Sequence, residues 1–159
     1  MYLAHIPINH HLRGLYRVVA GLSGLYLVAL GIFGIIETSG LELFAQEDLP
    51  EVWGQQLNPA SAGMLLVLGG IVVIVTVIGR NLDHYVNFWI GQILIVVALL
   101  SMAVLRTDAN VLGFNMTSVI VVMVVGVLIL TASMYAKVGR SEQRHDPADV
   151  QHPNPRVAA

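Results

Sequence analysis

The hydrophobic positions of this chain form long uninterrupted blocks, unlike the short alternations of a soluble domain. Four blocks contain no Asp, Glu, Lys or Arg, and they cover residues 18–36, 60–79, 86–105 and 116–136. A helix needs roughly 20 residues to cross a hydrocarbon core of about 30 Å. Barrel strands would show alternating polarity over about 10 residues, which these blocks lack. The pattern therefore predicts an all-α fold, an integral membrane four-helix bundle.

The composition agrees with this prediction and removes several functions. Hydrophobic residues make up 56% of the 159 residues and charged residues only 11%, against roughly 25% charged residues in soluble domains. The chain contains no cysteine, which excludes thiol nucleophiles, thiolate metal sites and disulfides. The net charge of −2 gives no reason to expect a nucleic-acid partner. The expected partners are the lipid bilayer and other membrane protein subunits, or further copies of the chain.

The basic residues predict how the helices are oriented. Seven of the eight Lys and Arg residues fall on one side of the predicted membrane, and only Arg106 falls on the other. The loop over residues 37–59 lies on the Arg106 side and carries five acidic residues and no basic one. Lys and Arg are enriched in cytoplasmic loops. We therefore expect a multi-pass protein of the cell (plasma) membrane, with both termini in the cytoplasm and an acidic external loop.

Outside the four blocks we expect two further segments. Residues 1–17 are amphipathic and would lie at the cytoplasmic interface. Residues 137–159 are polar and contain three prolines, so we expect a disordered cytoplasmic tail. The two halves of the chain share a few positions, among them Asn58 and Asn115 at the start of the returning helices. The membrane domain over residues 18–136 is thus compatible with a duplicated helical hairpin.

Small residues mark one face of the first predicted helix. Ala20, Gly24 and Gly31 share that face, and Gly34 lies beside it. Small side chains let helix backbones approach closely in lipid. We predict that this face packs within the bundle; the alternative is an interface between copies of the chain.

Three polar residues form the candidate transport set. Glu37 and Arg106 stand at the outer ends of the first and third predicted helices, where they can form a pair, and Gln92 lies inside the third. A small oligomeric transporter or channel would use these residues. No Asp, Glu, Lys, Arg or His lies in the middle of any predicted span, although intramembrane ionisable groups usually mark ion paths. Transport is therefore the alternative and not the leading interpretation.

A second group of polar residues lies at the predicted cytoplasmic border. Arg80 and Asp83 flank a tight turn, where they can pair, and His84 follows. Asp83 and His84, together with His10 and His11, could serve a lipid-modifying enzyme. However, no histidine lies inside a span to act as an axial haem ligand, and adjacent histidines on a helix diverge by about 100°. We therefore predict no catalytic residue, no cofactor and no metal site.

The loop sequences resemble a known family. The matching segments are Asn9-His10-His11-Leu12-Arg13, Asn58-Pro59, Arg80-Asn81-Leu82-Asp83-His84 and Thr107-Asp108-Ala109-Asn110-Val111-Leu112. They are similar to an actinobacterial family of small four-span membrane proteins, domain of unknown function 4383. The resemblance covers about residues 5–140 and lies in loops, where hydrophobicity alone does not produce matches. It implies a four-span membrane protein and brings with it no established activity and no site residues.

These observations favour a non-enzymatic integral membrane protein, an accessory or assembly subunit of a larger membrane complex. The missing membrane charges, the missing nucleophile and the glycine-lined helix face all support this interpretation. Two alternatives remain open. One is the small oligomeric transporter or channel that uses Glu37, Gln92 and Arg106, and the other is the lipid-modifying enzyme at the cytoplasmic border.

Overall fold

The computed structural model describes residues 11–138. Its four long helices are α1 (Arg13–Glu37), α2 (Pro59–Ile78), α3 (Leu82–Val104) and α4 (Met116–Tyr135). Each is long and apolar enough to cross a membrane. A short antiparallel pair, β1 (Glu51–Val52) and β2 (Gln55–Gln56), lies between α1 and α2 in the chain. The prediction of an all-α membrane four-helix bundle is confirmed, whereas the predicted tail from residue 139 and residues 1–10 lie outside the described part.

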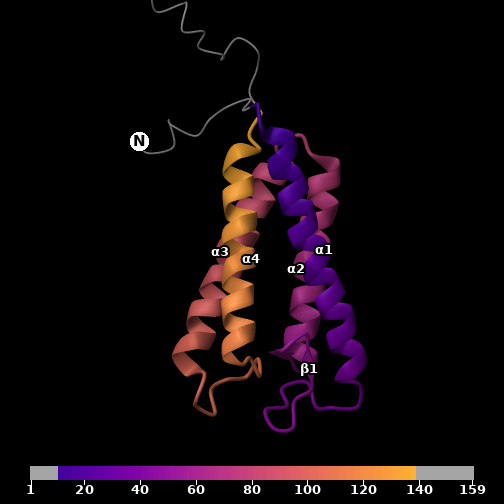
Figure 1. The fold of residues 1–159 in the computed structure, drawn as a ribbon, viewed down its shortest axis with the longest axis vertical. Coiled ribbons are helices and arrows are strands. Elements are labelled where there is room, and N and C mark those ends of the chain that lie inside the picture. Colours follow the sequence, from indigo (N-terminus) through magenta and orange to yellow (C-terminus); the bar gives the residue numbers. More distant parts are fainter. Residues whose placement is uncertain (1–10, 139–159) are drawn as a thin grey trace, which may run out of the picture.

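The helices are arranged as two antiparallel hairpins, α1 with α2 and α3 with α4 (Figure 1). The hairpins meet at the end where α1 begins and α4 ends, and they diverge toward the opposite end. We call the first the closed end and the second the open end. The loop between α2 and α3 lies at the closed end, and the two longer loops, residues 38–58 and 105–115, lie at the open end.

Two helices begin earlier than the charge-free blocks predict. α1 starts at Arg13 instead of residue 18, and α3 starts at Leu82 instead of residue 86. The additional turns contain Arg17 and Asp83, whose opposite charges lie together at the closed end. The charge-free blocks are shorter than the helices because charged residues that pair with each other do not end a helix.

The two helices that start at the open end begin with asparagine caps. The Asn58 side chain accepts a hydrogen bond from the Ser61 backbone N–H at 2.9 Å, and the Ser61 hydroxyl accepts one from the Asn58 N–H at 3.0 Å. The Asn115 side chain accepts from the Ser118 N–H at 2.8 Å. Such caps satisfy backbone donors that have no partner within the helix. They fix where α2 and α4 enter the bundle.

The small-residue face of α1 lies against α2. Ala20, Gly24, Gly31 and Gly34 are all buried. A Cβ atom added at Gly31 would lie 2.6 Å from the backbone nitrogen of Leu66, which is closer than Cβ atoms approach in proteins. Because glycine carries only a hydrogen atom in place of a side chain, the backbones of α1 and α2 can touch at Gly31. The face is therefore occupied within the bundle and does not form an outer surface.

The two hairpins use corresponding glycines. Gly24 meets Gly69 in the first hairpin, and Gly91 meets Gly126 in the second. A shift of 67 positions relates Gly24 to Gly91, and a shift of 57 positions relates Gly69 to Gly126. The same shift of 57 relates the two asparagine caps. The two shifts differ because the second open-end loop is shorter than the first. The glycine contacts and the asparagine caps therefore align the two helical hairpins with each other in a single way.

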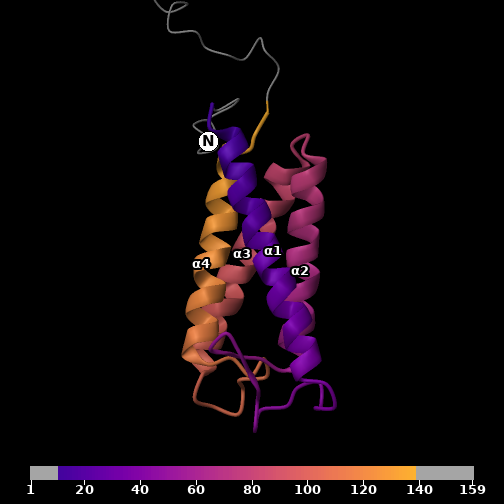
Figure 2. The same ribbon diagram turned by 45° about the vertical axis from the view of Figure 1, so that its right-hand side comes forward.

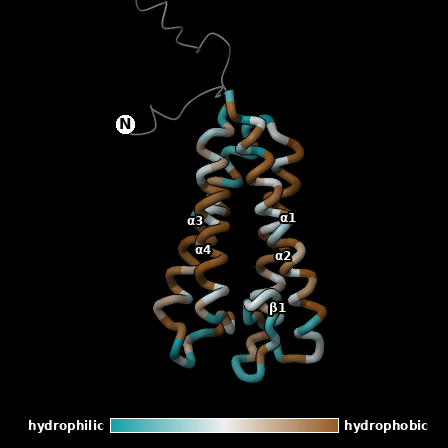
Figure 3. Tube along the Cα trace, viewed as in Figure 1, coloured by the Kyte–Doolittle hydropathy of each residue, from teal (hydrophilic) through white to brown (hydrophobic). Residues whose placement is uncertain are grey.

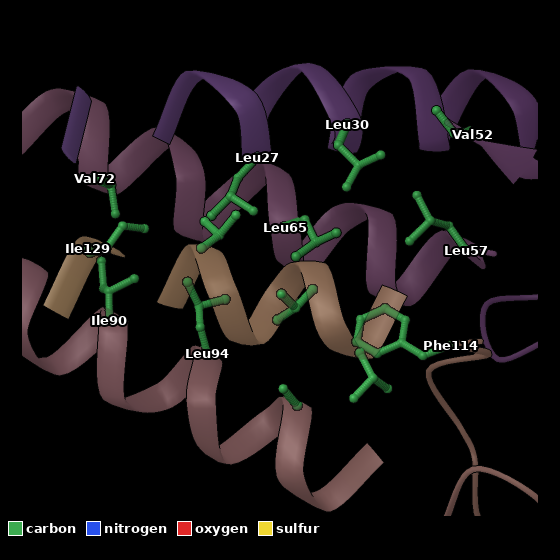
Figure 4. Packing of buried hydrophobic residues seen from close by; sticks show 14 residues of the cluster. Leu27, Leu30, Val52, Leu57, Leu65, Val72, Ile90, Leu94, Phe114 and Ile129 are labelled. Atoms are coloured by element: carbon green, nitrogen blue, oxygen red, sulfur yellow. The ribbon is translucent and has the colours of Figure 1, made fainter. Parts of the chain in front are cut away.

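The middle of the bundle is an apolar core to which all four helices contribute (Figure 4). Leu27, Leu65, Leu94 and Ile129 are fully buried there. Along the molecule, hydrophilic positions gather at the two ends and hydrophobic positions fill the length between them (Figure 3). An apolar layer thus separates the polar groups of the closed end from those of the open end.

Candidate functional site

The closed end contains a buried ionic cluster centred on Asp83. This side chain is only 1% exposed, and its Oδ2 atom lies 3.4 Å from Nε of Arg17 and 3.6 Å from Nη2 of Arg13. Both arginines belong to α1, whereas Asp83 lies in the first turn of α3. The carboxylate therefore joins the two hairpins at the end where they meet.

The same arginines also bind the ends of the two returning helices. Arg13 donates from Nε to the carbonyl of Ala136 at 2.9 Å, just beyond α4. Arg17 donates from Nη2 to the carbonyl oxygens of Thr76 and Val77, in the last turn of α2. The last carbonyls of a helix have no partner within it and form its negative pole. Two cations of α1 thus contact all three other helices.

His84 makes the equivalent contact in the second hairpin. Its Nδ1 atom lies 2.7 Å from the carbonyl oxygen of Ser133, and because a carbonyl only accepts, Nδ1 carries the proton. The shift of 67 positions places His84 where Arg17 stands in α1, and the shift of 57 places Ser133 where Thr76 stands in α2. In each hairpin, therefore, a donor near the start of the first helix binds a carbonyl near the end of the second.

Two asparagines extend the closed-end cluster. Asn87, one turn after Asp83, donates from Nδ2 to the Thr76 hydroxyl at 3.1 Å. Asn81, in the left-handed turn before α3, donates to the carbonyl of Val138 at 2.8 Å and accepts from its N–H. These bonds connect α3 to α2 and to the segment after α4. The cluster is a clamp that holds the four helices together.

The clamp is poorly arranged for chemistry on an external substrate. Asp83 and His84 are both buried, and their charged or donor atoms face neighbouring helices. Residues 11–138 contain no group of three or more His, Asp or Glu side chains that could hold a metal ion. His11 is exposed at the start of the described segment, and His10 lies outside it.

Arg80 does not take part in the clamp, although the turn sequence suggested that it could pair with Asp83. Arg80 is exposed and has a φ of 56°, whereas Asp83 is shared by Arg13 and Arg17. The long-range partners prevail because the long side chains of Arg13 and Arg17 reach from α1 to the first turn of α3 at the closed end. Which side chains meet there depends on the packing of the helices, which a local sequence pattern does not encode.

The candidate transport residues do not come together. Glu37 and Arg106 are exposed at the open end and form no ion pair within residues 11–138. The two hairpins diverge there, which separates the ends of α1 and α3 (Figure 1). Gln92 is half-buried in α3. The fully buried Leu27, Leu65 and Leu94 lie between the closed end and the Glu37 and Arg106 side chains at the open end.

The β1–β2 hairpin lies between the diverging helix pairs at the open end. The carbonyl of Gly54 accepts from Asn115 Nδ2 at 3.1 Å, and the carbonyl of Gln56 accepts from the Ser118 hydroxyl at 2.9 Å. On the other side, Gln55 donates to the hydroxyl of Tyr26 in α1 at 2.7 Å. These three hydrogen bonds connect the hairpin to α1 on one side and to the start of α4 on the other.

Sequence reasoning missed this hairpin. The available signal was the Trp53-Gly54 pair at the tip, where both residues have positive φ, 53° and 78°. The Trp53 ring lies beside two aromatic rings of α1, with centroids 5.8 Å from Tyr26 and 5.5 Å from Phe33. The indole remains 56% exposed on the outside of the bundle.

A groove opens directly beside this aromatic group. It runs between α1 and α4, which diverge toward the open end (Figure 2), and it has a volume of about 390 Å³. Its lining is apolar except for Ser23 and Tyr26 and comprises Leu22, Ser23, Tyr26, Ile120, Val121, Val124, Val125 and Leu128. Tyr26 therefore belongs both to the groove and to the group that holds the hairpin.

Comparison with known proteins adds no relative from which a function could be transferred. No family model matches this sequence, and no curated protein and no solved structure is significantly similar to it. The structure thus defines a class, a small four-helix membrane bundle, and membership of domain of unknown function 4383 stays a prediction.

Proposed function

We propose that this protein is a non-enzymatic accessory or assembly subunit of a larger membrane complex. The observation that carries the proposal is the contrast between the two ends of the bundle. At the closed end the buried carboxylate of Asp83 is used in contacts between helices, whereas the open end exposes charges that have no ion-pair partner among residues 11–138, beside exposed aromatic rings. A subunit that binds another protein needs an accessible face, and the open end supplies one.

The two alternatives receive less support from the geometry. A pathway through the bundle would need polar groups across its middle, where Leu27, Leu65 and Leu94 are fully buried. A lipid-modifying enzyme would need accessible acid–base groups, but Asp83 and His84 are buried and bonded to other helices. Membership of the actinobacterial family remains a proposal on the strength of the loop motifs.

Isolation of the complex tests the proposal. The natively expressed chain, carrying a small affinity tag, is purified in mild detergent, sized on a native gel and analysed by mass spectrometry. We expect a particle larger than the chain alone that contains a second membrane protein in fixed stoichiometry. A particle that contains only this chain, at native expression and in two different detergents, would contradict the accessory role.

We also propose that the closed end faces the cytoplasm. It carries Arg13, Arg17, Arg80 and Lys137, whereas Arg106 is the one basic residue of the open end among residues 11–138. Because the chain has no cysteine, single cysteines report sidedness directly. In intact cells, Ser39→Cys should react with a membrane-impermeant maleimide, and Arg80→Cys should react only after permeabilisation. Both positions are exposed, so the opposite pattern would reverse the proposed orientation.

A further inference from the structure

We infer that the α1–α4 groove, Trp53 and the acidic residues of the open end together form a docking surface for a transmembrane helix of a partner protein. The partner helix would carry basic residues at its flank near the open end. This inference rests on the proposed function and specifies which surface is used and the chemistry of the partner. Three features of the surface follow one another along α1, from mid-membrane to the open end.

The first feature is the groove itself. It lies at the level of Leu22 and Tyr26, halfway along α1, and is open toward the membrane. Side chains of a neighbouring helix can fill such a space as knobs fill holes, and close packing of this kind drives helix association in lipid. A lipid chain can enter a groove too, but the remaining two features add requirements that a lipid chain does not meet.

The second feature is the aromatic group on the open-end side of the groove. Trp53 rests on Tyr26 and Phe33, and both Trp53 and Phe33 remain about half exposed. Tryptophan is among the residues that most often dominate binding energy at protein interfaces. Its ring is held in place here by a hairpin whose backbone is hydrogen-bonded to α4. A pre-positioned side chain loses little conformational entropy on binding.

The third feature is the charge of the open end. Among residues 11–138, six acidic side chains lie at this end and are all exposed; they are Glu37, Glu42, Glu47, Asp48, Glu51 and Asp108. Arg106 is the single basic residue there, and none of the seven forms an ion pair within the described residues. Complementary charge steers association and selects partners. A basic flank on the partner helix is the complement that this surface requires.

Photocrosslinking in native membranes tests the docking surface. The full-length chain carries p-benzoylphenylalanine at one position, Trp53 or Val124 for the surface and Ile74 as the control. Val124 lines the groove, and Ile74 is equally exposed but lies on α2 outside the groove. We expect adducts from positions 53 and 124 to one transmembrane helix of the same protein, next to Lys or Arg residues, and no such adduct from position 74.

The double variant Glu37→Lys, Glu51→Lys tests the charge requirement. Both side chains are exposed and form no ion pair within the described part of the chain, so the fold should persist, and the adduct yield at position 53 should fall about fivefold. Equal yields from all three positions, adducts only to lipid or to a second copy of this chain, or a yield that charge reversal leaves unchanged would each overturn the inference. If the complex isolated in detergent persists while the adducts fail, only the docking surface is wrong; if no complex exists, the proposed function has failed as well.

Discussion

Gly69→Val is expected to destabilise the bundle by about 3 kcal/mol, at the upper end of the usual cost of overpacking. A Cβ atom at Gly69 would lie 2.7 Å from Leu27 Cβ, 2.8 Å from the Gly24 carbonyl oxygen and 2.9 Å from the Val28 nitrogen. Two of these three atoms are backbone, so a side-chain rotation cannot relieve the clash. α1 and α2 would have to separate, which also withdraws Leu27 and Leu65 from the core.

The neighbouring position provides a matched control. Gly70 lies in the same helix, and a Cβ atom added there would meet nothing within 4 Å. Gly70→Val makes the same change in chemistry and helix propensity without the contact. The free energy of unfolding in mixed micelles, followed by denaturant titration, should drop for Gly69→Val and stay within about 0.5 kcal/mol of the parent for Gly70→Val. Equal losses in the two variants would show that the close approach of α1 and α2 is not what matters.

These glycines also show what the sequence can and cannot predict. The face of Gly24 and Gly31 follows from helical periodicity alone, and so does the expectation that it is packed. That its partner is the Gly69 face of α2 depends on how the two helices cross. The equivalent contact of Gly91 and Gly126 was not predicted, because one small residue per helix forms no visible stripe. Its register becomes clear only once the first contact is known.

The candidate site likewise could be predicted only in part. The long apolar segments predict four membrane spans, because each segment that crosses lipid must by itself be apolar and long enough. Pairing of Asp83 depends on which side chains of other helices reach it, and the sequence pointed to the neighbour Arg80 where the structure uses Arg13 and Arg17. The pair that Glu37 and Arg106 could form is absent among residues 11–138, because the hairpins diverge at the open end. Local patterns locate polar residues, and helix packing decides which of them meet.

Asp83→Asn is expected to lower the free energy of unfolding by about 2–3 kcal/mol. Removing one partner of a buried ion pair typically costs about 3–5 kcal/mol, because the remaining charge is left uncompensated. The side chains of Arg13 and Arg17 are 28% and 33% exposed, so water compensates part of that loss. Asparagine retains the size of the side chain, which means that the change reports on charge and not on a cavity. Denaturant titration in mixed micelles measures the loss.

Two exposed residues serve as controls for this prediction. Asp108→Asn makes the same chemical change at the open end, and Arg80→Gln removes the cation closest to Asp83 along the loop; neither residue forms an ion pair within the described chain. Both variants should remain within about 0.5 kcal/mol of the parent. A loss in Arg80→Gln as large as that in Asp83→Asn would mean that a pair within the turn, and not the ion pairs of Asp83 with Arg13 and Arg17, holds the closed end. If Asp83→Asn alone is strongly destabilised, the carboxylate joins the two hairpins, and the open end is the part of the molecule left available for a partner.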